Sequence, residues 1–117
     1  MGYREDLIVA FEYESFDSKP FWIAAGIRRN DDLICHAVTM ARDVGRPLRG
    51  KGIGRVLLRY PSLRLLHGEY SVVGMVLDES GIVFFHRKES PTFAIVPPME
   101  WQQEMGLVDL EHEWKVL

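Results

Sequence analysis

The sequence has few cysteines and no long apolar stretch, so it lacks the features that mark disulfide-rich and membrane-spanning proteins. It holds one cysteine, Cys35, so no disulfide can form within the chain, which fits a reducing compartment. Its longest apolar stretches, residues 21–27 and 72–77, fall far short of the roughly 20 residues that a membrane-spanning helix needs. Residues 1–6 are polar and charged, unlike the start of a signal peptide. These absences argue against a membrane span, a signal peptide and a disulfide framework.

Motifs for catalysis and metal binding are also missing. The adjacent Cys35 and His36 would point to opposite faces of a strand, so they cannot pair as nucleophile and base, and Cys35 is interpreted as a small core residue. Glu111 and Glu113 share a face, but the edges of sheets commonly carry such charges for solubility. We therefore predict no catalytic residue, no metal and no cofactor. No two histidines have a zinc-site spacing; they stand at His36, His67, His86 and His112.

Composition and charge are those of an ordinary globular domain. The 117 residues are 47% hydrophobic and 26% charged, which predicts one domain over residues 1–117. The net charge is −3, but residues 42–64 hold seven Arg or Lys against one Asp, so this segment carries 7 − 1 = +6. Nucleic-acid binders usually have a basic domain, so no nucleic-acid partner is predicted. The favoured interpretation is a solvated loop and strand.

Short runs of alternating apolar and polar residues, separated by turn residues, dominate the chain. A period of two residues is typical of β-strands, and no stretch of ten or more residues has a clean helical period outside residues 49–58. The pattern predicts an all-β fold, an immunoglobulin-like antiparallel sandwich of about eight strands. The expected strands cover residues 7–14, 21–28, 33–41, 56–60, 69–78, 82–88, 92–96 and 107–114.

Two local motifs support the sandwich. Leu66, Gly68 and Tyr70 have the spacing of a tyrosine corner, in which a Tyr hydroxyl bonds the backbone a few residues upstream. The sequence Glu79-Ser80-Gly81 predicts a hairpin turn, with a glycine where a positive φ is needed.

The segment from Arg49 to Gly54 offers an alternative. It looks like the Arg-x-x-Gly-x-Gly motif of GNAT N-acetyltransferases, in which a helix N-terminus receives the pyrophosphate of acetyl-CoA. That chemistry needs several helical turns after the glycines, and Pro61 would end any helix near Tyr60. A mobile loop entering a strand is therefore preferred, and acetyl transfer remains an alternative.

From residue 21 onward, an ordered set of segments resembles the C-terminal carbohydrate-binding domain of Wzt-type ATPases, the nucleotide-binding subunits of ABC exporters for O-antigen and related polysaccharides. The chain departs from that family in lacking a Gly-Glu opening strand and in a long Arg-rich insertion at residues 42–55. It contains no Walker motif. The segments that carry the resemblance are residues 20–28, 63–70, 78–81, 93–96 and 106–114.

The resemblance implies a non-catalytic domain of lipopolysaccharide biosynthesis. In that family the domain lies in the cytoplasm at the inner face of the inner membrane and holds a finished, lipid-linked glycan for export. Its implied partners are the polysaccharide, the ATPase domain, the membrane permease and a second copy bound by exchange of the terminal strand.

An independent argument for binding comes from the hairpin of residues 69–88, where both faces are apolar. One face covers the core, and the other then meets a partner, a neighbouring element or a ligand. Aromatic side chains stack on sugar rings, and Arg and His donate directed hydrogen bonds. A pure dimerisation or assembly module is a further alternative. The candidate ligand-binding residues are Trp22, Arg28, His36, Arg59, Met75, Phe85, His86 and Arg87.

Overall fold

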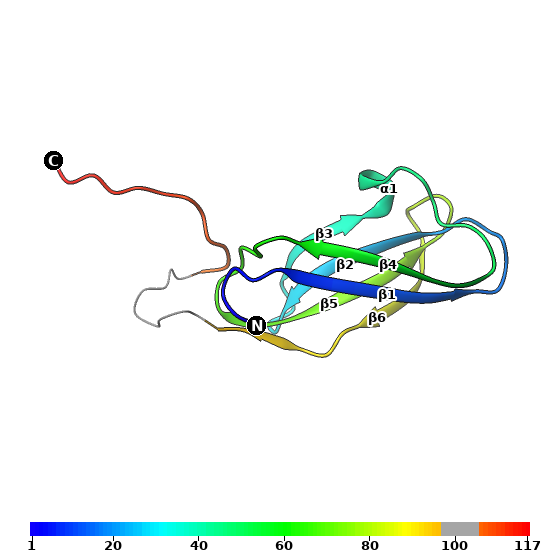
Figure 1. The fold of residues 1–117 in the computed structure, drawn as a ribbon, viewed down its shortest axis with the longest axis horizontal. Helices are drawn as coiled ribbons and strands as arrows, with labels where there is room; N and C mark the ends of the chain where they lie inside the picture. Colours follow the sequence, from blue (N-terminus) through cyan, green and yellow to red (C-terminus); the bar gives the residue numbers. More distant parts are fainter. Residues whose placement is uncertain (97–105) are drawn as a thin grey trace.

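The computed structural model describes residues 1–96 and 106–117. Within them it has seven strands and one short helix, and no helix there is long and apolar enough to cross a membrane (Figure 1). In chain order the elements are β1 (Leu7–Ser15), β2 (Trp22–Arg29), β3 (Ile34–Thr39), α1 (Met40–Asp43), β4 (Gly52–Tyr60), β5 (Gly68–Leu77), β6 (Phe84–Glu89) and β7 (Phe93–Ile95).

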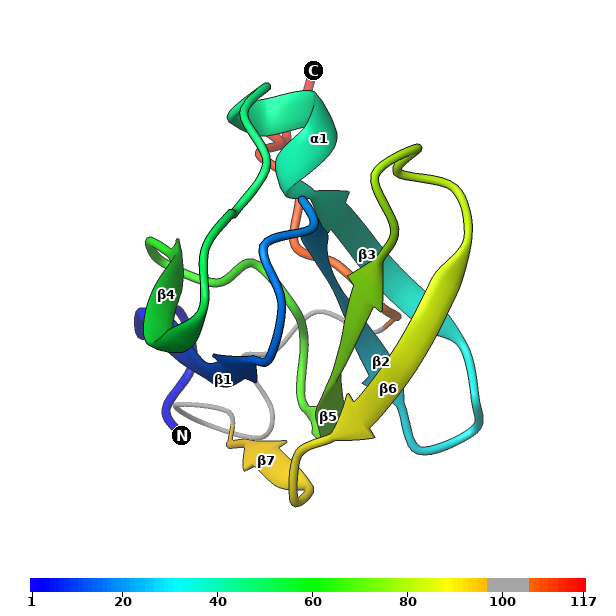
Figure 2. The ribbon, with the colours of Figure 1, turned by 90° about the vertical axis from the view of Figure 1, so that its right-hand side faces the viewer.

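The strands form two antiparallel sheets. β1 pairs with β4, and the larger sheet has the order β3-β2-β5-β6, with β7 also on β5. Because Tyr70 of β5 pairs with both Arg29 of β2 and Phe93 of β7, β6 and β7 share one edge of β5. Figure 2 shows the small sheet lying over the large one. The expected immunoglobulin-like sandwich is confirmed.

The core is centred on β2 and β5, which are buried over consecutive residues, whereas the burial of β1 and β4 alternates. Ile27 of β2 and Tyr70 of β5 are almost fully buried, as is Leu66 in the connection before β5. Phe11 of β1 lies over Gly74 of β5, so that side of β5 faces the small sheet. Apolar residues on these inner faces leave water together, and this burial stabilises the sandwich.

The tyrosine corner is present. The Tyr70 hydroxyl donates a 2.6 Å hydrogen bond to the carbonyl oxygen of Leu66. A Cβ on Gly68 would lie only 3.3 Å from that hydroxyl, so a glycine keeps the corner open. The hairpin turn is also as expected, because Gly81 has a φ of +74° and donates its N–H to the carbonyl of Asp78.

Several strand ends differ from expectation. The strand predicted over residues 33–41 ends at Thr39, whose hydroxyl accepts the Ala41 N–H at 3.2 Å and caps α1. β4 begins at Gly52, four residues before the predicted start at Val56, because the glycine-rich segment pairs with β1. β6 begins two residues later than predicted, since residues 82 and 83 belong to the turn.

The strand predicted at residues 107–114 does not form, which leaves seven strands rather than about eight. Val108 makes one isolated bridge with Leu65, and residues 109–117 have no strand pairing in the structure. The alternating pattern is there, but a strand also needs an edge to pair with. In Figure 1 this segment extends away from the sandwich.

Candidate functional site

The face of the large sheet that points away from β1 and β4 is here called the outer face. Register defines it, because Ala24 is opposite Met75 while Ile23 and Val76 point to the core. The outer face combines small, apolar and charged side chains, of which Ala24, Ser71, Val73 and Leu77 are buried while Trp22, Arg28 and Met75 are half-buried. On β2 and β5 it comprises Trp22, Ala24, Gly26, Arg28, Ser71, Val73, Met75 and Leu77.

Trp22 lies at one end of the outer face. Its side chain is half-buried, and its indole N–H donates a 3.0 Å hydrogen bond to the carbonyl of Glu79 in the β5–β6 turn. A Cβ on Gly81 would lie 3.7 Å from the indole ring, so the turn rests against Trp22. The hydrogen bond fixes the ring plane beside the outer face.

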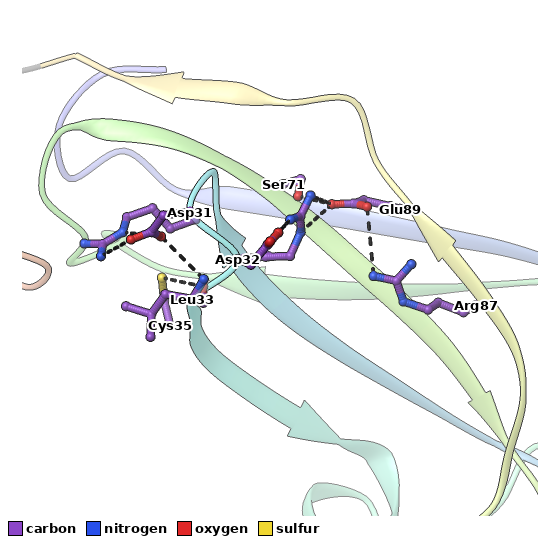
Figure 3. Close-up of polar contacts among 9 residues, drawn as sticks. Asp31, Asp32, Leu33, Cys35, Ser71, Arg87 and Glu89 are labelled. Carbon is purple, nitrogen blue, oxygen red and sulfur yellow. Dashed lines mark hydrogen bonds and ion pairs between the residues drawn. The ribbon is translucent and has the colours of Figure 1, made fainter.

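A polar cluster occupies the end of the outer face away from Trp22 (Figure 3). Glu89 of β6 accepts a 2.6 Å hydrogen bond from the Ser71 hydroxyl and a 2.7 Å bond from the Arg28 Nε, and Arg87 lies 3.9 Å from its second oxygen. Arg28 also pairs with Asp32 in the β2–β3 turn. The Ser71 hydrogen bond, followed by Arg28, lowers the pKa of Glu89, which keeps this carboxylate ionised.

The structure places four of the eight predicted residues on the outer face, with Trp22 and Arg28 at its two ends and the Met75–Arg87 pair between them. Phe85 is close by on β6, at an irregularity between the Val76–His86 and Leu77–Phe84 pairs, and its side chain is 65% exposed. His86 has the register of Val76, on the opposite side of the strand.

The remaining two candidates lie elsewhere. Arg59 is on the far side of the small sheet and makes an ion pair with Asp6 at 2.7 Å. His36 places its Nδ1 3.0 Å from the Tyr60 hydroxyl, with the two rings edge to face. The eight residues therefore do not form one site.

His36 and Tyr60 border a cavity of about 260 Å³ at the open side of the sandwich. Ile27, Leu63 and Val108 supply much of its apolar lining. Cys35 also lines this cavity and packs against the core, and burial raises the pKa of its thiol. A raised pKa leaves less thiolate at neutral pH, which makes Cys35 a weak nucleophile.

Sequence reasoning missed Ser71 and Glu89. Both are polar residues within a strand or at its end, and the alternation of apolar and polar residues alone assigns such residues to a solvated face. What brings them together is the pairing of β5 with β6 and β2, which places Glu89 opposite Val73 and Arg28 opposite Ser71. A polar residue interrupting the apolar outer set of β5 was the signal available, and Ser71 is that residue.

The structure gives no support to acetyl transfer or metal binding in the part it describes. Residues 52–60, which would have to start a helix to hold a pyrophosphate, form strand β4 paired along its length with β1. Among residues 1–96 and 106–117, no three His, Cys, Asp or Glu side chains gather where they could hold a metal ion.

Comparison with known proteins identifies the fold. The chain is similar to a solved structure described as the crystal structure of the C-terminal domain of Wzt, with a TM-score of 0.71 and 12% sequence identity. The match covers 100% of this chain and 73% of that one. No protein-family model and no curated protein matches the sequence. The resemblance inferred from the sequence is confirmed at the level of the fold.

Proposed function

We propose that residues 1–117 act as a non-catalytic carbohydrate-binding domain that recognises an O-antigen-type glycan for export. The shared fold supports this proposal, as does the outer face. The observation that carries it is the placement on one sheet face of the half-buried Trp22 and Met75 and the hydrogen-bonded Ser71–Arg28–Glu89 cluster. Fold similarity alone does not assign a function, so the argument rests on this face.

The outer face offers both kinds of contact that a sugar needs. Trp22 and Met75 present half-buried apolar surface, which suits the C–H face of a pyranose ring. Arg87 is half exposed and engages Glu89 only at 3.9 Å, so its guanidinium can donate to hydroxyls or an anionic group. Glu89 accepts from Ser71 and Arg28 and still has a second oxygen for a sugar hydroxyl.

The proposed setting is the cytoplasmic face of the inner membrane, with an ABC exporter as the partner assembly. Because the sequence has no Walker motif, ATP hydrolysis belongs to a separate ATPase domain, which works with a membrane permease. The domain then contributes selection of the lipid-linked glycan rather than chemistry.

A titration followed by NMR tests the glycan proposal. With a panel of O-antigen oligosaccharides as probes, we expect saturable shifts of backbone amides on β2, β5 and β6 around the outer face. Arg87→Ala should weaken binding roughly tenfold, since a hydrogen bond from a charged donor contributes about 1.5 kcal/mol or more. The matched control is Arg55→Ala on the far side of the small sheet, where Arg55 makes only a 4.0 Å contact with Glu12.

Two outcomes would contradict the glycan proposal. One is the absence of shifts with every oligosaccharide of the panel. The other is a set of shifts confined to the cavity beside His36 and Tyr60, which would move the site away from the outer face. A Met75→Asp variant that abolishes self-association but leaves glycan binding intact would instead favour a second role of this face in assembly.

We also propose that two copies associate by exchange of residues 110–117, the part of the C-terminal segment (residues 106–117) that follows Asp109. Val108, Leu110, Trp114 and Val116 alternate with polar residues, which is a strand pattern, yet the last three are 66%, 91% and 98% exposed. β4 pairs with β1 along one edge and has no strand on its other edge among the described residues. The C-terminal segment of one copy, which has the pattern of a strand, can therefore pair with the free edge of β4 in a second copy.

A further inference from the structure

Strand β6 contains a β-bulge where it runs beside the end of β5. Val76 of β5 pairs with His86 of β6. The next residue of β5, Leu77, pairs with Phe84, so Phe85 is an extra residue with no partner of its own on β5. A bulge bends its strand and changes the direction in which a side chain points.

The bulge places two adjacent phenylalanines on the outer face. Phe84 lies there because residues directly opposite each other point to the same side of a sheet, and its partner Leu77 belongs to the outer face. Phe85 lies there because it is two residues before Arg87, which pairs with Met75. The two phenylalanine side chains are 57% and 65% exposed. In a regular strand one of them would point to the other side of the sheet.

Trp22 adds a third aromatic ring to this part of the outer face. It pairs with Leu77, whose other neighbour is Phe84, so the three residues form one row across β2, β5 and β6. Two strand spacings, about 10 Å, separate the backbones of Trp22 and Phe84. Leu77 between them is only 7% exposed. The group made of Trp22, Leu77, Phe84 and Phe85 is here called the aromatic end.

Hydrogen bonds in the β5–β6 turn hold the aromatic end in place. The Asp78 N–H donates to the carbonyl of Val83 at 2.8 Å, and the Gly81 N–H donates back to the carbonyl of Asp78 at 2.9 Å. The Trp22 indole N–H donates to the carbonyl of Glu79 in the same turn. Aromatic side chains fixed in this way lose little conformational freedom when a ligand binds.

The size of the aromatic end suits a small ligand. An aromatic side chain has roughly 200 Å² of surface, so the exposed parts of the three rings amount to about 300 Å². A stable protein interface needs about 800 Å² on each partner. The aromatic end is also continuous with the surface of the glycan proposal, because the Met75–Arg87 pair lies between it and the Ser71–Arg28–Glu89 cluster.

We propose that the aromatic end is a subsite for a sugar that carries a methyl group, either that of a 6-deoxy sugar or that of an acetyl substituent. This inference rests on the proposed glycan function and specifies the sugar. The one polar side-chain atom of the aromatic end, the Trp22 indole nitrogen, is already bonded to Glu79. A sugar hydroxyl placed against the rings would therefore lose its hydrogen bonds to water, whereas a methyl group gains by leaving water.

Titration with pairs of sugars that differ in one substituent tests the subsite. The pairs are methyl α-L-rhamnoside with methyl α-L-mannoside, methyl α-L-fucoside with methyl α-L-galactoside, and N-acetylglucosamine with glucose. In at least one pair we expect the methyl-bearing sugar to bind about fourfold more tightly, which is the gain from burying one methyl group. In NMR spectra of the full chain, the shifts should centre on the amides of residues 22, 76–78 and 83–86.

Variants of the exposed phenylalanines identify the rings that make the contact. Phe84→Ser should weaken binding of the methyl-bearing sugar at least fivefold, because it removes one ring, whereas Phe84→Tyr keeps the ring and should bind like the unmodified chain. The matched control is Ile8→Ser, which removes a side chain of similar exposure, 60%, from the far side of the small sheet. This control should leave sugar binding unchanged.

Three results would overturn the subsite. They are the absence of binding by all six sugars, equal affinities within every pair, and an equal loss in Phe84→Ser and Ile8→Ser. A fall in mass in solution caused by Phe84→Ser, with sugar binding intact, would also overturn it and make the aromatic end a protein interface. If the oligosaccharide panel still shifts the amides of Arg28, Ser71 and Glu89, the glycan proposal stands without this subsite. If the oligosaccharides give no shifts either, both proposals fail.

Discussion

At the scale of single residues, Asp109 is the most heavily bonded side chain in the protein's described part. Its carboxylate is 2% exposed and accepts from the Tyr3 hydroxyl at 2.5 Å, from Arg4 at 2.6 Å and from Arg64 at 3.1 Å. Its own N–H donates to the carbonyl of Arg64. One carboxylate thereby ties together the N-terminal segment, the β4–β5 connection and the start of the C-terminal segment.

The first prediction concerns the pH dependence of stability at Asp109. Arg4 above all, with Tyr3 and Arg64, holds the pKa of this carboxyl well below its ordinary value. The unfolded chain has the ordinary value of about 4, so the contribution of the ionised carboxylate is complete above that pH and is lost progressively as the pH falls from there towards the lowered pKa of the folded state. Asp109→Asn should lower the free energy of unfolding by about 2 kcal/mol at neutral pH, and by less near pH 3.

Urea denaturation at the two pH values measures this difference. Asp43→Asn is a suitable control, because Asp43 is exposed and makes no ion pair among the described residues. A stability gap between Asp109→Asn and the unmodified chain that stays constant with pH would contradict the assigned role of the carboxylate.

At the scale of elements, the contact of β1 with β5 sets how closely the two sheets approach. Gly74 of β5 faces the small sheet, and a Cβ there would lie 2.9 Å from the Phe11 ring. The ring is half-buried, so moving it aside costs packing contacts. The neighbouring Gly26 of β2 faces the other way, and a Cβ there would meet ordinary contacts of 3.5 Å and more.

Gly74→Ala and Gly26→Ala therefore form a matched pair for the second prediction. We expect Gly74→Ala to destabilise the fold by about 1–3 kcal/mol through overpacking of Phe11. Gly26→Ala should be close to neutral, because no backbone strain or clash opposes it. Thermal or urea unfolding of both variants decides the point, and equal effects would show that Phe11 does not limit the approach of the sheets.

Elements also show what a sequence can and cannot predict. The alternation of apolar and polar residues predicted most of the strands, and the spacing of Leu66, Gly68 and Tyr70 predicted the tyrosine corner. Both signals lie within short stretches of sequence, so they can be read without knowing which strands pair. The Ser71–Arg28–Glu89 cluster escaped because it depends on which strands pair and in which register. Residues 107–114 were wrongly predicted as a strand of the single chain, because alternation reports what a segment is suited to and not whether an edge is available.

At the scale of the whole molecule, the sandwich is unevenly covered. Two strands lie over a larger sheet, and no residue of β1 or β4 belongs to the buried core. Leu58 and Val56 point inward from β4 but stay half-buried, and both line a second cavity of about 130 Å³ at the same open side as β3. A third strand beside β4 would cover these residues and satisfy the edge.

The last prediction follows from that open side. If the C-terminal segment of a second copy fills it, light scattering coupled to gel filtration should give twice 13.5 kDa for the unmodified chain. Trp114→Asp should yield monomers, because it places a charge on the face of the segment that becomes buried. Glu113→Ala changes the neighbouring residue on the opposite face and should leave the dimer intact. Strand exchange would be excluded if the unmodified chain ran as a monomer, or if Trp114→Asp and Glu113→Ala changed the mass in solution equally. Strand β4 would then be an ordinary free edge.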